Sequence, residues 1–536
     1  MVRHCGMSVM ALGLAPIVLL ATACRTAAGA PPASPGASAA PASAPPPQPP
    51  PSLTRQKVDA ALGRLDGFAQ EAMSRTGVPG MAIAVVYGDK VVYLKGFGVR
   101  QVGKQEAVDA DTVFQLASLS KPLASTVLAG VAGQRTVSWD DPVVKYDPGF
   151  ALADRWVTGH VTLADLFSHR SGLPDHAGDL LEDLGYDQAY ILAHLRDEPL
   201  APFRASYAYT NFGLTEAAVA VAKAKGTTWE DLSDTTLYKP LGMNSTSSRF
   251  ADYDKAGDKA LTHVKVNGSW QAKFTRDPDA QSPAGGVSST ARDMAQWTRL
   301  QLGSGRLAGR QIIDAGALAR TYVPEIVSAP PPVPTGRVGL YGLGWNVGYD
   351  DHGRLRLSHS GAFAMGAATN VTLLPSEELG IVVLTNGAPV GVPEAVSSDF
   401  LSYAQDGKVS VDWLGFYGKL IAAADEAGRS KTDYSHPPAN AAKAKPPAAY
   451  TGTYASPHYG RLTISVSGGD LVMRLGPKAM RFVLQHYSGD TFSYQTAGEN
   501  AVGRSGVTFT MGPSGTPTKV TVEHLNADGL GTFTKG

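Results

Sequence analysis

The main folding region of the chain has strand-like segments at both ends and helix-like segments between them, and this order limits the fold more than any other feature. The strand-like segments are residues 80–88, 90–96, 354–359, 368–374 and 379–384. The first two are joined by Gly-Asp-Lys, which predicts a hairpin. Helical patterns occupy residues 119–132 and 212–224. We therefore expect residues 53–404 to form an α+β domain whose antiparallel sheet joins segments distant in the sequence.

A second, smaller domain is predicted at the C-terminal end. A helical pattern at residues 411–426 and a stretch rich in Lys, Ala, Asn and Pro at 431–448 indicate a helix and linker over residues 405–448. Residues 449–536 follow, with short strand-like runs separated by glycines at 460–466, 470–475, 491–494, 507–511 and 519–522. Strands at this spacing indicate a small antiparallel barrel or sandwich, and we expect an all-β barrel.

The first 52 residues differ in composition from the rest. An apolar run at residues 9–20 follows Arg3 and His4 and ends in small residues, which is typical of an export signal, assigned to residues 1–30. The run is short for a permanent bilayer span. Residues 31–52 are almost entirely Pro, Ala, Ser and Gly, a composition that predicts a semi-rigid spacer.

Both cysteines of the chain, Cys5 and Cys24, fall in the signal-like segment, so no disulfide and no thiolate metal site is expected after processing. Cys24 ends the run Leu-Ala-Thr-Ala-Cys, which resembles a permissive bacterial lipobox, in which the cysteine is lipidated. The same small residues also fit ordinary signal cleavage. The alternatives are therefore a periplasmic or outer-membrane lipoprotein tethered through Cys24, which is slightly favoured, and an untethered periplasmic or secreted protein.

Charge and motif content argue against several classes of protein. The 47 Lys and Arg residues balance the 47 Asp and Glu residues, which argues against a protein that binds nucleic acid through a basic surface. None of the 12 histidines begins a His-Glu-x-x-His motif and no Cys-x-x-Cys occurs, so we expect neither a metal nor another cofactor. No serine has the flanking glycines of a Gly-x-Ser-x-Gly elbow, which argues against an α/β-hydrolase.

The first candidate catalytic motif is Ser118-Leu-Ser-Lys121, which occurs once in the chain. It lies at the expected start of a helix, where residues three apart share a face, so the Lys121 amine can lie beside the Ser118 hydroxyl. A helix start also offers free N–H groups to a developing anion. Taken alone, this motif is better explained by a helix cap followed by a surface lysine.

The second candidate motif is Tyr209-Thr-Asn211, which also occurs once. A phenol beside a lysine ammonium can lose its proton more easily and serve as a general base toward a serine. Asn211 could hydrogen-bond the lysine or the substrate. A half-buried aromatic residue and a turn asparagine would give the same pattern.

The third candidate motif is His359-Ser-Gly361-Ala362, at the end of a strand-like segment. Gly361 would let substrate backbone approach the strand edge, and the N–H of Ala362 would help to form an oxyanion hole. A second His-x-Gly sequence begins at His176, but it lacks a flanking strand and we rank it below His359.

Together, the three motifs in this order resemble the serine β-lactamase/penicillin-binding-protein-like hydrolases, especially the branch of class C β-lactamases, related esterases and D-amino-acid-directed peptidases. The segments 166–174, 238–243 and 284–293 are also similar to that family. The resemblance implies a β-lactamase-like antiparallel sheet with a helical domain, with His169 and the Gly285-Gly286 turn as structural markers. The region from Tyr450 resembles the lipocalin-like domain appended to some members.

By this resemblance Ser118 is the nucleophile, Lys121 lowers its proton affinity, Tyr209 is the base, and the N–H groups of Ser118 and Ala362 form the oxyanion hole. His359 stands where antibiotic-hydrolysing members usually carry a lysine that meets the substrate carboxylate. An imidazole is mostly neutral at pH 7, which favours ester or peptide substrates over efficient β-lactam hydrolysis.

We therefore expect an exported serine hydrolase that acts on a small-molecule or peptide substrate, and the sequence is compatible with an oligomer. The alternative is a penicillin-binding sensor or scaffold of the cell envelope that stops at the acyl-enzyme.

Overall fold

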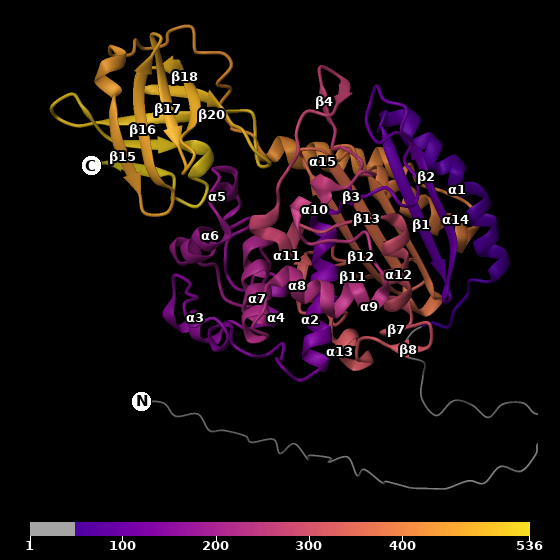
Figure 1. The fold of residues 1–536 in the computed structure, drawn as a ribbon. Coiled ribbons are helices and arrows are strands. Elements are labelled where there is room, and N and C mark those ends of the chain that lie inside the picture. The colour runs from indigo at the N-terminus through magenta and orange to yellow at the C-terminus, as the bar shows by residue number, and fades with distance from the viewer. Residues whose placement is uncertain (1–48) are drawn as a thin grey trace, which may run out of the picture. The chain divides into compact units, whose positions relative to one another are not determined.

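The computed structural model describes residues 49–536, and its largest element is an eight-stranded sheet (Figure 1). The strand order is β2-β1-β14-β13-β12-β11-β10-β9, and every neighbouring pair is antiparallel. The strands are β1 (Gly80–Tyr87), β2 (Lys90–Gly98), β9 (Ile326–Ala329), β10 (Gly339–Tyr341), β11 (Asn346–Tyr349), β12 (Leu355–Phe363), β13 (Ala367–Leu374) and β14 (Leu379–Thr385). The predicted hairpin and the predicted pairing of sequence-distant strands are both confirmed, because β1 pairs with β14.

Helices cover the two faces of this sheet unequally. Alternate residues of β1 face opposite cores: Ile83 and Val85 pack with α1 (Arg55–Thr76) and α14 (Val392–Asp406), while Ala82 and Ala84 face the larger helical region. A strand buried on both faces carries apolar residues continuously, which explains the unbroken apolar run from residue 80 to 87. The α+β assignment is therefore confirmed.

The helical region lies between the two sets of strands in the sequence. Its longer helices are α2 (Ser120–Gly133), α7 (Asn211–Ala224) and α12 (Ala291–Leu302). Its shorter helices are α3 (Arg155–His160), α4 (Leu163–Phe167), α5 (Asp179–Asp183), α6 (Gln188–His194), α8 (Trp229–Ser233), α9 (Lys239–Leu241), α10 (Phe250–Lys255), α11 (Ser282–Gly285) and α13 (Ala315–Arg320). Three two-stranded ribbons complete it: β3 (Phe114–Gln115) with β6 (Ser288–Ser289), β4 (Val264–Val266) with β5 (Ser269–Gln271), and β7 (Arg306–Leu307) with β8 (Arg310–Gln311).

The C-terminal region is a closed barrel of eight antiparallel strands in chain order, which confirms the barrel prediction over the sandwich. The strands are β15 (Gly452–Ser456), β16 (Gly460–Ser467), β17 (Asp470–Leu475), β18 (Met480–Ser488), β19 (Thr491–Gln495), β20 (Arg504–Met511), β21 (Pro517–Val522) and β22 (Thr532–Lys535). Closure by β15 pairing with β22 removes the free sheet edges. Buried aromatic residues such as Tyr450, Phe492 and Phe509 pack edge to face inside it.

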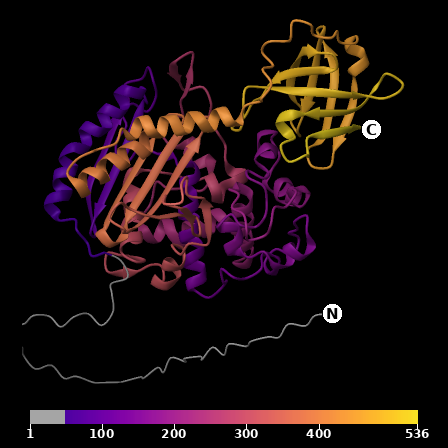
Figure 2. The ribbon, with the colours of Figure 1, turned by 180° about the vertical axis from the view of Figure 1, so that it is seen from behind.

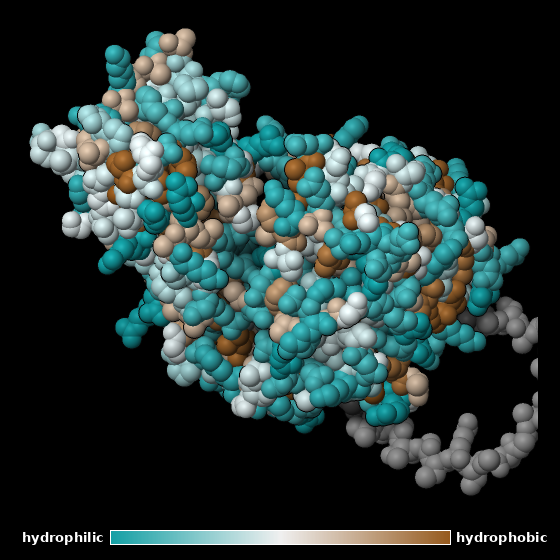
Figure 3. Space-filling view, turned by 45° about the horizontal axis from the view of Figure 1, so that its top comes forward, coloured by the Kyte–Doolittle hydropathy of each residue, from teal (hydrophilic) through white to brown (hydrophobic). Residues whose placement is uncertain are grey.

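The predicted helix at residues 411–426 is confirmed as α15 (Trp413–Gly428), which precedes the barrel. The domain limits at residues 404 and 449 stay predictions, although α14 and β15 lie on the expected sides of them. The signal-like segment, Cys5, Cys24 and nearly all of the Pro-rich spacer lie outside the described residues. Within residues 49–536, no helix is both long and apolar enough to cross a membrane. Figure 3 shows a face dominated by hydrophilic residues with small scattered hydrophobic groups.

Candidate active site

Ser118 lies in a 3-10 turn, Ala117–Leu119, directly before α2, so the helix proper begins one residue later than the predicted start at residue 119. Ala117 adopts a positive φ of 49°, a conformation that costs an alanine free energy and is common next to functional residues. The Ser120 hydroxyl donates to the Ala117 carbonyl at 2.7 Å and accepts from the Val287 N–H at 3.0 Å. These bonds fix the turn, while Ser118 itself remains partly exposed.

The Lys121 side chain is fully buried, and its amine reaches the serine as the spacing predicts. Its Nζ lies 3.0 Å from Ser118 Oγ, 2.7 Å from Asn211 Oδ1 and 3.1 Å from the Ala284 carbonyl oxygen. Burial lowers the pKa of Lys121 to about 7, an effect that the charge of Asp179 partly opposes. The amine is therefore neutral in a large fraction of molecules at neutral pH.

The hydrogen bonds around Lys121 determine what a neutral amine can do there. The Ala284 carbonyl can only accept, and Asn211 is oriented by donating its Nδ2 to Asp179 Oδ2 at 2.8 Å, so its Oδ1 must accept. Two N–H groups of the amine are thus used by these two oxygens. The remaining lone pair faces Ser118 Oγ, which can donate its proton to it.

Tyr209 lies under the same amine, with Lys121 Nζ 4.4 Å from the centre of the phenol ring. Burial raises the pKa of Tyr209 well above its ordinary value, although a hydrogen bond with Ser118 opposes the shift. The phenol therefore keeps its proton. The structure brings Tyr209 to the serine as predicted, but its electrostatics do not favour the expected phenolate base.

His359 is buried on β12 beside this cluster. Its Nδ1 lies 2.7 Å from the Ser360 carbonyl oxygen, which can only accept, so Nδ1 carries the proton and Nε2 accepts from the Tyr341 hydroxyl at 3.0 Å. Burial, with the charge of Lys121, lowers the pKa of His359 to about 3. Both ring nitrogens are therefore engaged in hydrogen bonds. The ring is neutral, as expected from the sequence.

Gly361 and Ala362 border the nucleophile turn. A Cβ on Gly361 would lie 2.1 Å from the Leu116 carbonyl oxygen and 3.0 Å from the Leu119 N–H, so only glycine allows β12 to approach so closely. β11 pairs with β12 only up to Ser358, which leaves the following edge of β12 free of that strand. Ala362 is exposed at this edge.

Several polar residues of the site were not predicted from the sequence. Asp179 orients Asn211 and also accepts from His176 Nδ1 at 2.7 Å, and the His176 ring lies 5.8 Å from that of Tyr209. Although burial lowers it, the bond to Asp179 raises the pKa of His176 to about 9. The histidine ranked second therefore lies in the site and is charged. Asp179, three positions after His176, was the sequence feature that could have indicated this histidine–carboxylate pair.

The two family-like markers have structural positions. His169 Nδ1 accepts from the Thr210 N–H at 3.2 Å, and its ring lies 4.6 Å from that of Tyr209. The Gly285-Gly286 turn follows Ala284 in α11 and so places the carbonyl that Lys121 uses. Neither marker contacts Ser118 through any hydrogen bond found among the described residues.

The barrel contributes a loop to the edge of the site. Glu499, between β19 and β20, accepts from the N–H groups of Ala364 and Met365 at 2.6 and 3.2 Å, just beyond Ala362 on the chain. Its carboxylate also pairs with Arg276 at 3.1 Å, and Arg276 pairs with Glu182 at 2.8 Å. The Arg276 guanidinium lies 4.3 Å from the centre of the Phe363 ring. The barrel therefore stabilises the turn between β12 and β13, next to Ala362.

A second interaction fixes this barrel loop. Asp183 accepts from the N–H groups of Glu499 and Asn500 at 2.8 and 2.9 Å and from the Asn500 side chain at 3.0 Å. Gly498 has a positive φ of 107°, and a Cβ there would lie 2.4 Å from the Asp183 carboxyl carbon. These hydrogen bonds hold the loop in one position against the C-terminal end of α5.

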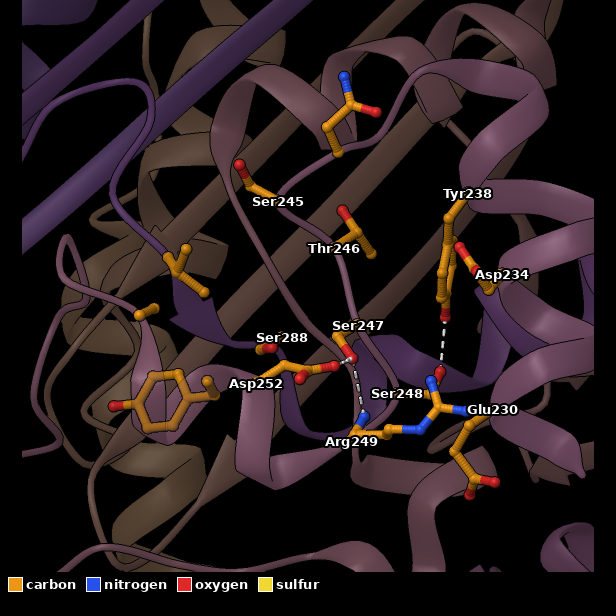
Figure 4. A pocket seen from close by; sticks show the side chains of 14 residues that line it. Glu230, Asp234, Tyr238, Ser245, Thr246, Ser247, Ser248, Arg249, Asp252 and Ser288 are labelled. Atoms are coloured by element: carbon orange, nitrogen blue, oxygen red, sulfur yellow. Dashed lines mark hydrogen bonds between the residues drawn. The ribbon is translucent and has the colours of Figure 1, made fainter.

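Figure 4 shows a separate polar pocket of about 350 Å³, lined by residues that include Tyr238, Ser248, Arg249 and Asp252. Neither Ser118 nor Lys121 lines it. The Ser248 carbonyl accepts from the Ser282 hydroxyl at 2.6 Å, at the start of α11. The pocket therefore lies outside the catalytic cluster, and we infer that its residue Ser248 stabilises α11, the helix that carries Ala284.

Comparisons with known proteins agree with this geometry. Residues 65–402 match the family model described as Beta-lactamase, and residues 436–531 match a domain of unknown function, DUF3471. The chain is 25% identical over 500 residues to the Unguisins hydrolase ungD of Aspergillus violaceofuscus, covering 83% of this chain and 85% of that protein. It is 25% identical over 336 residues to the D-alanyl-D-alanine-carboxypeptidase/endopeptidase AmpH of Escherichia coli, covering 61% and 84%.

A third relative, Penicillin-binding protein 4 of Amycolatopsis lactamdurans, is 28% identical over 326 residues, covering 58% of this chain and 81% of that protein. Among solved structures, the octameric penicillin-binding protein homologue from Pyrococcus abyssi superposes with a TM-score of 0.56 at 20% identity. It covers 86% of this chain and 98% of that one. This last likeness concerns the fold alone.

Proposed function

The chain belongs to the beta-lactamase family, a family of serine hydrolases, and from that premise we propose that it hydrolyses peptide amides or carboxylic esters through an acyl-enzyme on Ser118. The observation that carries the proposal is the surroundings of Lys121. A buried amine with a pKa of about 7 uses two N–H groups on Asn211 and Ala284 and faces the serine hydroxyl with its lone pair.

In the acylation step, Lys121 takes the Ser118 proton while Oγ bonds to the substrate carbonyl carbon. The carbonyl oxygen becomes negative and is held by the N–H groups of Ser118 and Ala362. The bond to the leaving nitrogen or oxygen then breaks, and that atom takes the proton from the Lys121 ammonium through the Tyr209 hydroxyl. Tyr209 acts here as a proton relay rather than as the initial base.

Deacylation follows the same path in reverse. A water molecule gives its proton to the neutral Lys121 amine as its oxygen bonds to the acyl carbon, and the proton then returns to Ser118 Oγ when the ester bond breaks. The products are a carboxylic acid and the regenerated serine, so atoms and charge balance. No metal or cofactor is required for either step.

The substrate class follows from the charge near β12. His359 is neutral and has both nitrogens engaged, so it provides no fixed cation for a substrate carboxylate. The names of two relatives describe hydrolysis of unguisins and of D-alanyl peptides. We therefore propose capped or cyclic peptide amides and short-chain esters as substrates, with β-lactams as slow ones.

The test is a comparative assay with a chromogenic cephalosporin, a short-chain nitrophenyl ester, a D-alanine anilide and an N- and C-capped peptide. We expect turnover of the ester and the capped peptide, and loss of turnover in Ser118→Ala. Ser74→Ala, the same change on the exposed face of α1, is the matched control. Equal rates in Ser118→Ala and wild type would refute the mechanism.

The second candidate function is a penicillin-binding sensor of the envelope, which the neutral His359 also permits. Intact-mass spectrometry distinguishes it: a sensor accumulates one stable adduct on Ser118 from a β-lactam, with no release over hours. A hydrolase returns to its free mass as product appears.

We also propose that the protein is exported, because residues 1–30 have the pattern of a signal segment. Whether Cys24 is lipidated can be read from the mass of the mature N-terminal peptide. A diacylglycerol adduct on Cys24 supports the lipoprotein, and cleavage without it supports the untethered form.

A further inference from the structure

On the sheet face opposite the catalytic cluster, β12 and β13 present polar residues toward the helices. We call this surface, made by Ser358, Ser360, Asn370 and Thr372, the polar floor. His359 points toward the active site, and its neighbours in β12 therefore point to the other face. There, Ser358 lies opposite Thr372 and Ser360 lies opposite Asn370 on β13. Figure 2 shows these strands from the side on which α15 crosses them.

This floor contrasts with the other half of the same sheet. Where α1 and α14 cover β1 and β14, the facing residues are apolar, among them Ile83, Val85 and Ile381. A sheet that packs directly against helices presents apolar residues to them. The hydroxyl and amide pairs on β12 and β13 therefore differ from the apolar residues that the rest of this face presents to α1 and α14.

A cavity of about 410 Å³ lies between this polar floor and the helices α14 and α15. Its volume is in the range of about 300 to 1,000 Å³ that is common for small-molecule sites. One wall is aromatic: Trp413, Phe416 and Tyr417 of α15 lie with ring centres 5.2 to 6.0 Å apart. Phe416 is 51% exposed and lines the cavity, so its ring is accessible to a ligand there.

The polar groups of the cavity include both donors and acceptors. Asn370 donates to the Ser360 hydroxyl at 3.1 Å, and Ser360 also hydrogen-bonds the Glu394 carboxyl of α14. Burial raises the pKa of Glu394, an effect that the bond to Ser360 opposes, and its carboxyl oxygens are acceptors in the cavity. Arg356 faces the same cavity and has no ion pair within residues 49–536.

These features select one chemical class of ligand. A phosphate or nucleotide would need an excess of cations, whereas Asp350, Asp351 and Glu394 outnumber Arg337 and Arg356 in the lining. A lipid would need an apolar floor. A sugar ring has hydroxyls that donate and accept and an apolar C–H face that packs on an aromatic ring, which matches a polar floor with an aromatic wall.

We propose that the cavity between β12, β13 and α15 binds a neutral oligosaccharide, at a site separated from Ser118 by the thickness of the sheet. The sugar hydroxyls pair with Ser358, Ser360 and Arg356, and a sugar ring packs on Phe416. This proposal does not depend on the catalytic mechanism. It gives the protein a second binding surface on the strand that borders its active site.

Isothermal titration of the full chain carrying Ser118→Ala with maltotriose, cellotriose and chitotriose tests the proposal. We expect saturable binding of at least one trisaccharide with a dissociation constant of about 1 mM or tighter. Phe416→Ala should weaken it about tenfold or more, and so should Ser358→Val, which removes the floor hydroxyl and puts two methyl groups in its place. Leu420→Ala, one turn further along α15, exposed and outside the cavity lining, is the matched control and should bind as the parent does.

Circular dichroism of each variant confirms that it is folded before titration. Absence of saturable binding by all three sugars overturns the proposal. Binding that survives both Phe416→Ala and Ser358→Val also overturns it, because the sugar would then lie elsewhere. Binding lost equally in Leu420→Ala would show a disturbed helix rather than a site, and would likewise contradict the proposal.

Discussion

Two buried cations lie near the active site, and their different partners give them different functions. Lys121 contacts only neutral groups directly, and burial lowers its pKa to about 7. Arg276 pairs with Glu182 and Glu499, and despite burial these carboxylates raise its pKa. A buried amine without a carboxylate partner can exchange protons, whereas a buried guanidinium with two of them stays charged and fixes structure.

The largest expected effect comes from removing the first cation. Lys121→Met keeps the length of the side chain but has no lone pair able to accept the serine proton. We expect kcat to fall by about 10³-fold or more, with a moderate loss of thermal stability, because Asn211 Oδ1 and the Ala284 carbonyl lose the donor that Lys121 supplies. Ester hydrolysis rates and a thermal melt of the same preparation measure both. A fall of less than about tenfold would contradict the assignment.

For Arg276 we expect the opposite result, a loss of stability with little loss of activity. Glu499→Gln leaves Arg276 with one carboxylate and weakens the seat of the barrel loop. Breaking a buried ion pair from one side costs about 3 to 5 kcal/mol, so we expect a clearly lower melting temperature with kcat changed by less than about tenfold. Glu523→Gln, on the barrel and outside this contact, is the control. An unchanged melting temperature would mean that the barrel loop does not dock on Arg276.

The sequence predicted the catalytic cluster better than it predicted this second contact. Ser118 and Lys121 are three residues apart at the start of a helix, so local geometry alone brings them together. Arg276 and Glu499 lie far apart in the chain and carry no motif, and only the docking of the barrel joins them. The proton affinities of Tyr209 and Lys121 could not be predicted either, because burial rather than residue type shifts both pKa values.

The fold also divides into elements that local sequence predicts and elements that depend on distant segments. The hairpin β1–β2 and the barrel strands β16, β17, β19, β20 and β21 follow from local alternation and turn residues and were predicted, whereas β15, β18 and β22 were not. The strands β9 and β10 were not, because they are short and their pairing is set by the edge of a sheet built from distant segments. His176 was ranked low for lack of a strand, although it reaches the site from a loop before α5.

The pH dependence of the reaction provides a smaller, graded test. Because protonated Lys121 cannot accept the serine proton, kcat/KM should be low in acid and rise to a plateau through about pH 7, the pKa of the free enzyme. Burial also raises the pKa of Glu182 to about 7. Glu182→Gln is therefore the control, and it should keep the inflection. Loss of the inflection in that variant would assign it to the carboxyl group instead.

The smallest expected effects are opposite shifts of that inflection. The charge of Asp179 raises the pKa of Lys121 and that of Arg276 lowers it. Asp179→Asn should therefore move the inflection to lower pH, and Arg276→Met should move it to higher pH, each by about one unit or less. Shifts in the same direction in both variants would show that the two charges do not act on Lys121.

The most direct measurement is the rate at which a fluorophosphonate labels Ser118 as a function of pH, with the labelled peptide identified by mass spectrometry. This reaction needs the activated serine but no particular substrate. If the neutral amine of Lys121 is the base, the rate rises through about pH 7 and is flat above it. A rate that stays low at pH 8 and rises only toward pH 10 would identify Tyr209 as the base and contradict this account.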